Sequence, residues 1–135
     1  PTRALQEAIY ELEHLGFVST EGALAPSIIL VRPEYALFWA FDPVVSGNEP
    51  ARDAAAIGRE IVATEPPTGK VATLHERTGW QRRRFNPALA KLMSLFPEGR
   101  YSKEIQNTYP TPHLLASPKE TFTLKRFIED TESSA

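Results

Sequence analysis

The sequence predicts a mostly helical α+β fold, and three observations favour it. Apolar residues recur at helical spacing, most clearly in residues 3–15 and 86–95. A short apolar run rich in β-branched residues, Ile28 to Val31, lies between polar and turn-forming segments and is typical of a strand. The order helix, β-hairpin, helix is expected twice in the 135 residues, once in residues 3–43 and again in 81–129.

The first part of the chain is expected to form a helix, a hairpin and a second helix. The expected elements are a helix at 3–15, strands at 17–18 and 28–31 around a polar turn at 19–22, and a helix from 32–34 to 41. Gly16 is a candidate stop for the first helix. Pro33 fits the first turn of the second helix, which is expected to end before Pro43.

The rest of the chain is expected to form a helical unit with one hairpin. The expected elements are helices at 51–63, 70–78 and 86–95, a hairpin at 100–116 and a helix beginning at Ser117-Pro118. The segment Pro66-Pro67-Thr68-Gly69 is expected to break the first of these helices. Asn86 is a candidate N-cap for the third helix, with Pro87 in its first turn.

Two features divide the chain into units. Residues 44–50 are rich in turn formers, which predicts a linker between a unit at 1–46 and a unit at 47–135. The helical pattern Ala8-Ile9-x-x-Leu12-x-x-Leu15 matches Ala88-Leu89-x-x-Leu92-x-x-Leu95, which lies 80 residues later. The repeat predicts that residues 3–43 and 81–129 fold alike, although similar helices also arise by chance.

Charge is distributed unevenly along the chain. Residues 1–66 contain four Lys or Arg and ten Asp or Glu, a net charge of −6, whereas residues 67–135 contain eleven and seven, a net charge of +4. A polyanion would be repelled by the first half and attracted to the second. Uneven decoration of a surface would give the same totals.

The residue usage excludes several classes of protein. The chain contains no cysteine, which rules out thiolate zinc sites and predicts a reducing, cytoplasmic location. Its apolar runs are too short to cross a bilayer, so no membrane partner is expected. The chain begins at Pro1 without an initiator Met or a signal peptide, which predicts a processed or excised start.

One stretch, Leu74 to Leu89, carries a specific pattern. Leu74 precedes a Gly79 turn, and apolar or small residues follow it at Trp80, Phe85 and Ala88. The stretch resembles the helix-turn-helix of the winged-helix DNA-binding superfamily. The resemblance covers about residues 51–130 and implies winged helix-turn-helix units with short β-hairpin wings, whereas residues 1–43 match only the third helix, wing and closing helix of such a unit.

The resemblance implies which residues would contact DNA. The sequence departs from the helix-turn-helix pattern at two positions. His75 stands where the pattern usually has Ala, and Pro87 lies inside the expected recognition helix. The candidate DNA-binding residues are Gln81, Arg82, Arg83, Arg84, Asn86, Lys91, Arg100 and Lys103. Arginine can bind guanine edges or phosphates, and Gln and Asn can bind adenine edges. A solvated basic face, or ion pairs with the acidic first half, would explain the arginines equally well. We expect Trp80 and Phe85 to be buried, and the three arginines to be replaceable without loss of stability.

No pattern indicates an enzyme, a cofactor or a metal site. His14, His75 and His113 are far apart, and His75-Glu76 is expected to be a surface pair. The resemblance implies a double-stranded DNA-binding protein of the transcriptional regulator or replication-initiator type. The alternative is a protein-interaction or dimerisation module, with a partner protein or second copy bound through the acidic first half and its aromatic residues 35–41.

Overall fold

The computed structural model describes residues 3–22, 30–64, 68–97 and 108–134. These residues are mostly helical and contain two small antiparallel sheets, so the α+β class is confirmed. No helix among them is long and apolar enough to span a lipid bilayer.

The first elements form an arm. They are helix α1 (Arg3–His14), strands β1 (Val18–Glu21) and β2 (Leu30–Pro33), and helix α2 (Tyr35–Val45). Gly16 ends α1, as expected, in the left-handed conformation with φ 81°. Its N–H donates to the Glu13 carbonyl at 3.0 Å, and the Phe17 N–H donates to the Leu12 carbonyl at 2.9 Å. This is the Schellman arrangement, which satisfies carbonyls at the end of a helix.

The structure corrects three boundaries in the arm. Residues 19–21 belong to β1 and not to a turn, because its antiparallel pairing with β2 continues to Glu21 opposite Leu30. Pro33 ends β2, and α2 begins after Glu34. α2 also continues through Pro43 to Val45, since a proline near a helix end removes only one of the last i→i−4 hydrogen bonds.

The remaining elements form a body. They are helix α3 (Pro50–Ala63), strand β3 (Thr68–Lys70), helices α4 (Val71–Thr78) and α5 (Arg82–Met93), strand β4 (His113–Leu115) and helix α6 (Pro118–Ser133). The expected helices at 51–63, 70–78 and from Ser117-Pro118 are confirmed. α5 begins earlier than expected, after Gln81, so Asn86 lies inside the helix and does not cap it.

The sheet of the body joins segments that are distant in sequence. β3 pairs antiparallel with β4, with Gly69 opposite Leu114 and Lys70 opposite His113. Thr68 and Gly69 therefore lie in a strand and not only in a helix break. Much of the hairpin expected at 100–116 lies outside the described residues. The described partner of β4 is β3, which precedes α4, whereas β2 pairs with β1, so the described residues of 81–129 do not show the hairpin pairing found in residues 3–43.

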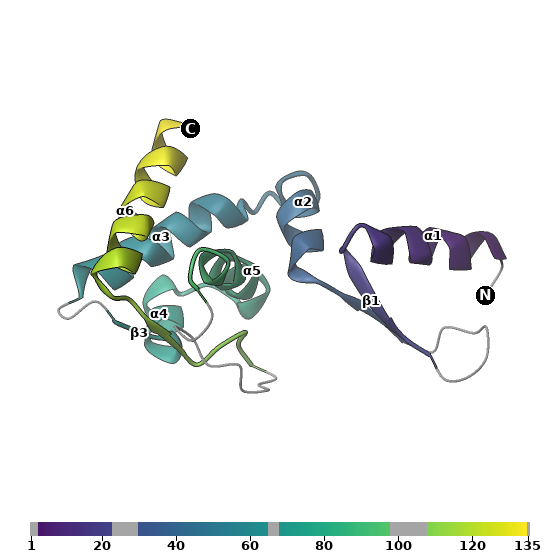
Figure 1. The fold of residues 1–135 in the computed structure, drawn as a ribbon, viewed down its shortest axis with the longest axis horizontal. Helices are drawn as coiled ribbons and strands as arrows, with labels where there is room; N and C mark the ends of the chain where they lie inside the picture. Colours follow the sequence, from purple (N-terminus) through teal and green to yellow (C-terminus); the bar gives the residue numbers. More distant parts are fainter. Residues whose placement is uncertain (1–2, 23–29, 65–67, 98–107, 135) are drawn as a thin grey trace.

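Five of the six elements of the body, all but β3, contribute residues to one apolar core. Its members are Ala54, Ile57, Ile61, Val71, Leu74, Phe85, Ala88, Leu89, Leu92, Phe96, Leu114 and Leu124. Phe85 is fully buried, as expected, and Trp80 is half-buried against the core. Figure 1 shows α5 between α3, α4 and α2, with α1, β1 and β2 projecting away from the body.

Gly79 makes the turn between α4 and α5 in the left-handed conformation, with φ 68°. We expect Gly79→Ala to lower the free energy of unfolding by about 1 kcal/mol, because a side chain strains this backbone conformation. An added Cβ would meet no atom within 4 Å, so the cost comes from the backbone alone. Chemical denaturation would measure it.

Gly58→Ala is the matched control for this substitution. Gly58 lies inside α3, where an added Cβ would make ordinary contact with Ile128 at 3.5 Å. Alanine is the better helix former, so this change is expected to raise stability by up to about 1 kcal/mol. Equal effects at the two glycines would contradict the assignment of a strained turn to Gly79.

Candidate nucleic-acid interface

The candidate arginines lie in the first turn of α5 and point in different directions. Consecutive residues of a helix project about 100° apart, so Arg82, Arg83 and Arg84 cannot share one face. Each of them has a different set of neighbours in the structure. The three do not form one continuous ridge of free positive charge.

Arg83 pairs with Asp42 of α2. Its Nη1 donates to Oδ2 at 2.8 Å and its Nη2 donates to Oδ1 at 2.6 Å, which is the bidentate geometry of a strong arginine–carboxylate pair. The guanidinium carbon also lies 4.1 Å from the centre of the Phe38 ring. Arg83 therefore links α5 to α2 through one ion pair and one cation–π contact.

Arg84 makes an equivalent pair with Asp53 of α3. Its Nε and Nη2 donate to the two carboxylate oxygens, both at 2.9 Å. The guanidinium lies over the Trp80 ring, 4.1 Å from its centre. Arg84 thus links α5 to the helix that begins the body.

Both pairs have a buried carboxylate and a half-exposed arginine. The Asp42 and Asp53 side chains are 4% and 8% exposed, whereas those of Arg83 and Arg84 are 49% and 42% exposed. The hydrogen bonds to the carboxylates raise the pKa of both guanidinium groups, against the opposing effect of desolvation. These pairs favour the opposite of the expectation that the arginines can be removed without loss of stability, because removal of Arg83 or Arg84 leaves a buried carboxylate without its partner.

Arg82 and Gln81 remain at the surface. Both side chains are exposed, and no described carboxylate pairs with Arg82. The guanidinium of Arg82 lies 5.9 Å from the centre of the Tyr109 ring, at the outer limit of a cation–π contact. Of the three arginines, Arg82 is therefore the one whose charge is free to meet an external anion.

The other candidate residues are placed less favourably. Asn86 is half-buried and donates from Nδ2 to the Thr108 carbonyl at 2.9 Å, while its Oδ1 is buried without a described partner. Lys91 is half-buried, with its ammonium 4.9 Å from the centre of the Trp39 ring. Arg100 and Lys103 lie outside the described residues.

A small hollow adjoins the first turn of α5. It has a volume of about 310 Å³ and is lined by Asn48, Gly79, Trp80, Gln81, Arg83 and Arg84. The N-cap residue Gln81 makes no side-chain capping hydrogen bond to the helix. The positive end of the helix dipole therefore borders this hollow, together with two guanidinium groups whose charges are balanced by Asp42 and Asp53.

His75 holds the arginine-bearing turn in place, a role that the sequence did not indicate. Its Nε2 lies 2.6 Å from the Trp80 carbonyl, and its Nδ1 lies 2.8 Å from the Tyr109 hydroxyl. Because a carbonyl only accepts, Nε2 carries the proton and a neutral ring accepts from Tyr109. The ring also packs on Phe85, with 4.7 Å between centres, so the expected surface pair with Glu76 is wrong.

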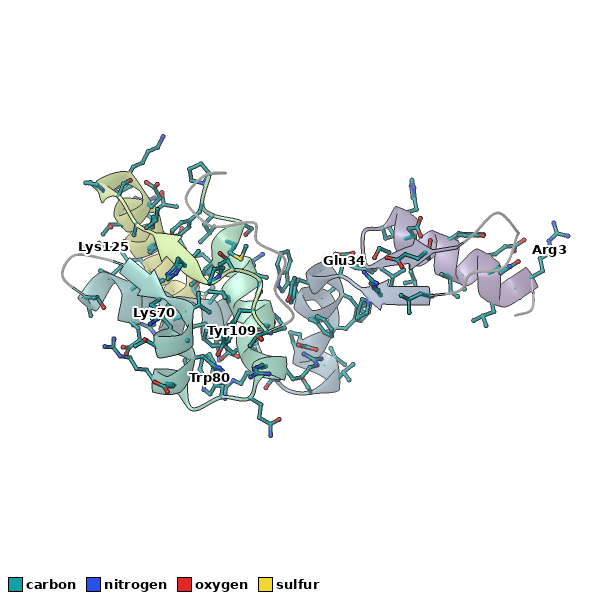
Figure 2. All side chains as sticks on the ribbon, turned by 90° about the horizontal axis from the view of Figure 1, so that it is seen from below. Arg3, Glu34, Lys70, Trp80, Tyr109 and Lys125 are labelled. Carbon is teal, nitrogen blue, oxygen red and sulfur yellow. The ribbon has the colours of Figure 1, made fainter. Side chains whose placement is uncertain are left out.

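Figure 2 shows Trp80 and Tyr109, the two residues joined by His75, on the same side of the body. The residues that sequence reasoning missed are His75, Asp42 and Asp53. The acidic character of the first half was a signal for the two aspartates, but it did not identify which carboxylates meet the arginines.

Comparisons with known proteins assign no family to the chain: no family model, curated protein or solved structure matches it. Within the described ranges, no cluster of three or more His, Cys, Asp or Glu side chains is placed to hold a metal ion. The geometry of the α5 turn is therefore the basis for a functional proposal.

Proposed function

We propose that the protein binds double-stranded DNA through the N-terminal end of α5. The observation that carries the proposal is the pair of helices α4 and α5, joined by the left-handed Gly79, with Gln81 and Arg82 exposed at the start of the second helix. Helix-turn-helix proteins present the N-terminal residues of their second helix to the major groove. Gln81 and Arg82 would then be the first residues to meet base edges or phosphates.

The order of elements in the body supports the same proposal. The resemblance implies three helices, a wing and a closing helix, and in the described body the three helices α3, α4 and α5 come before β4 and α6. The wing expected at 100–116, with Arg100 and Lys103, lies largely outside the described residues. The protein would act as a regulator or as the recognition module of a replication initiator.

Fluorescence anisotropy with a short random duplex tests the proposal. At about 50 mM salt we expect binding at least as tight as about 10⁻⁴ to 10⁻⁶ M, the range of ordinary non-specific complexes at physiological salt. Arg82→Ala should weaken binding and lower the slope of log affinity against log salt by about 0.9, because one phosphate contact is lost. A dissociation constant above about 10⁻⁴ M for the intact chain would contradict DNA binding.

Lys125→Ala is the matched control. It removes the same charge from the exposed side of α6, and Figure 2 shows Lys125 away from Trp80. We expect the salt slope of this variant to equal that of the unmodified protein. If both substitutions lower the slope equally, the protein attracts DNA through its total charge and not through α5.

The second candidate function is a protein-interaction or dimerisation module, and the surface of α1 favours it. The helix has no buried residue, and its Leu5 and Leu12 side chains are exposed, as is Leu15 directly after its end, although the three recur at helical spacing. An apolar stripe of this kind is typical of a helix that packs against a partner. If this second function is correct, the protein should not bind duplex DNA even at low salt. The anisotropy titration described above therefore separates the two functions.

A further inference from the structure

Helix α2 covers one side of α5 through contacts that are one helical turn apart. Asp42 binds Arg83, and one turn later Trp39 Nε1 donates to the Pro87 carbonyl at 2.8 Å. A further turn along, the Lys91 ammonium lies against the Trp39 ring. Residues four apart share one side of a helix, so α2 lies along the side of α5 that begins at Arg83.

Asp42 occupies the hydrogen-bonding edge of Arg83 that a phosphate would use. The carboxylate accepts from both terminal nitrogens of the guanidinium, at 2.8 Å and 2.6 Å. Arginine binds phosphate through the same planar, bidentate arrangement of donors. That edge cannot hold both groups in this geometry, so Asp42 excludes a DNA phosphate from the Nη1–Nη2 edge of Arg83.

The contacts of α2 with the body are suited to release. No described residue of α2 belongs to the apolar core, and Asp42 is the helix's one buried residue. A cleft of about 660 Å³ separates the two helices locally and is lined by Tyr35 and Trp39 on one side and by Ala90 and Met93 on the other. An ion pair, a hydrogen bond and two cation–π contacts therefore join α2 to α5, and a cleft interrupts the rest of the interface.

We infer that α2 is an intramolecular competitor of DNA at the N-terminal end of α5. The inference rests on the proposed DNA binding and concerns the regulation of that same site. A duplex binds the molecules in which Asp42 has left Arg83, and its apparent affinity falls in proportion to their fraction. Release of α2 frees the guanidinium of Arg83 and uncovers the side of α5 that continues to Pro87 and Lys91.

Asp42→Asn tests the inference, because a neutral amide cannot replace the two carboxylate contacts. If about one molecule in ten has released α2, complete release tightens duplex binding about tenfold. The salt slope should become steeper by about 0.9, since Arg83 gains a phosphate contact. Anisotropy titrations of both proteins against the same random duplex at several salt concentrations measure the two effects.

Two further variants separate release from a simple change of charge. Glu34→Gln removes the same negative charge beside α2 without touching Arg83, because Glu34 is exposed and precedes the helix. It should leave duplex affinity within about twofold of the unmodified protein. Trp39→Ala removes the hydrogen bond to Pro87 without changing any charge and should tighten binding.

The Trp39 indole N–H reports the position of α2 independently of DNA. Its NMR signal should shift in Asp42→Asn as the hydrogen bond to Pro87 is lost. A shifted signal with unchanged duplex affinity would overturn the inference and leave DNA binding in place. An unchanged signal would show that Asp42 does not hold α2, which also overturns it. No duplex binding by either protein would overturn the proposed function and the inference with it.

Discussion

Replacing Phe85 with alanine is expected to lower the free energy of unfolding by about 3–5 kcal/mol, as large-to-small changes in a packed core do. Phe85 is fully buried in the centre of the core. Its ring contacts His75 and Tyr109, with centres 4.7 Å and 5.9 Å apart. The substitution removes these contacts and leaves a cavity beneath the turn that carries the arginines. Urea denaturation followed by circular dichroism measures the loss.

Phe122→Ala provides the control for this prediction. It deletes the same ring from a side chain on α6 that is 64% exposed, so its effect should stay within about 0.5 kcal/mol. Phe85→Leu keeps the comparison measurable if the alanine variant does not fold. Equal losses at Phe85 and Phe122 would mean that α5 does not pack on the body through Phe85.

The sequence identified those parts of the fold that depend on local patterns. Phe85 was expected to be buried from its place after Gly79 and is fully buried, whereas Trp80, expected to be buried with it, is half-buried. The left-handed turn at Gly79 and the stop at Gly16 were also expected, since few other residues adopt that conformation without strain. Helical spacing and glycine are local signals, so a single sequence is sufficient to read them.

The sequence could not identify contacts between distant segments. Arg83 and Asp42 are 41 residues apart, Arg84 and Asp53 are 31 residues apart, and no local pattern specifies either pair. The pairing of β3 with β4 is of the same kind, because two three-residue strands carry little pattern of their own. Sequence reasoning placed the arginines on the correct helix and left open whether they meet DNA or pair with the acidic first half, but it could not identify the carboxylates.

These pairs change the meaning of the charge asymmetry. The two halves of the chain have opposite net charge. Two of the three arginines of α5 form ion pairs with aspartates of the acidic half, Arg83 with Asp42 of α2 and Arg84 with Asp53 of α3. Three arginines and two buried carboxylates leave a single net positive charge at the first turn of α5. A variant that lacks all three arginines would therefore lose stability as well as charge, and weaker DNA binding by it could come from either change. For this reason the substitution of Arg82 alone tests the contact with DNA.

Arg84→Ala is expected to lower the free energy of unfolding by about 2–4 kcal/mol. Removing one partner of a buried ion pair costs about 3–5 kcal/mol, because the other charge stays buried, and the half-exposed position of Arg84 reduces this cost. Asp53 is 8% exposed and would lose both of its 2.9 Å hydrogen bonds from Arg84. Chemical denaturation at neutral pH measures the loss.

Two variants show whether this loss comes from the buried carboxylate. Arg82→Ala deletes an identical side chain that has no described ion pair, and its effect should stay within about 0.5 kcal/mol. The double variant Arg84→Ala with Asp53→Ala removes both charges, so it should be more stable than Arg84→Ala alone. If Arg84→Ala is no more destabilising than Arg82→Ala, the pair with Asp53 does not hold α5 to α3. Arg84 would then be as available to DNA as Arg82.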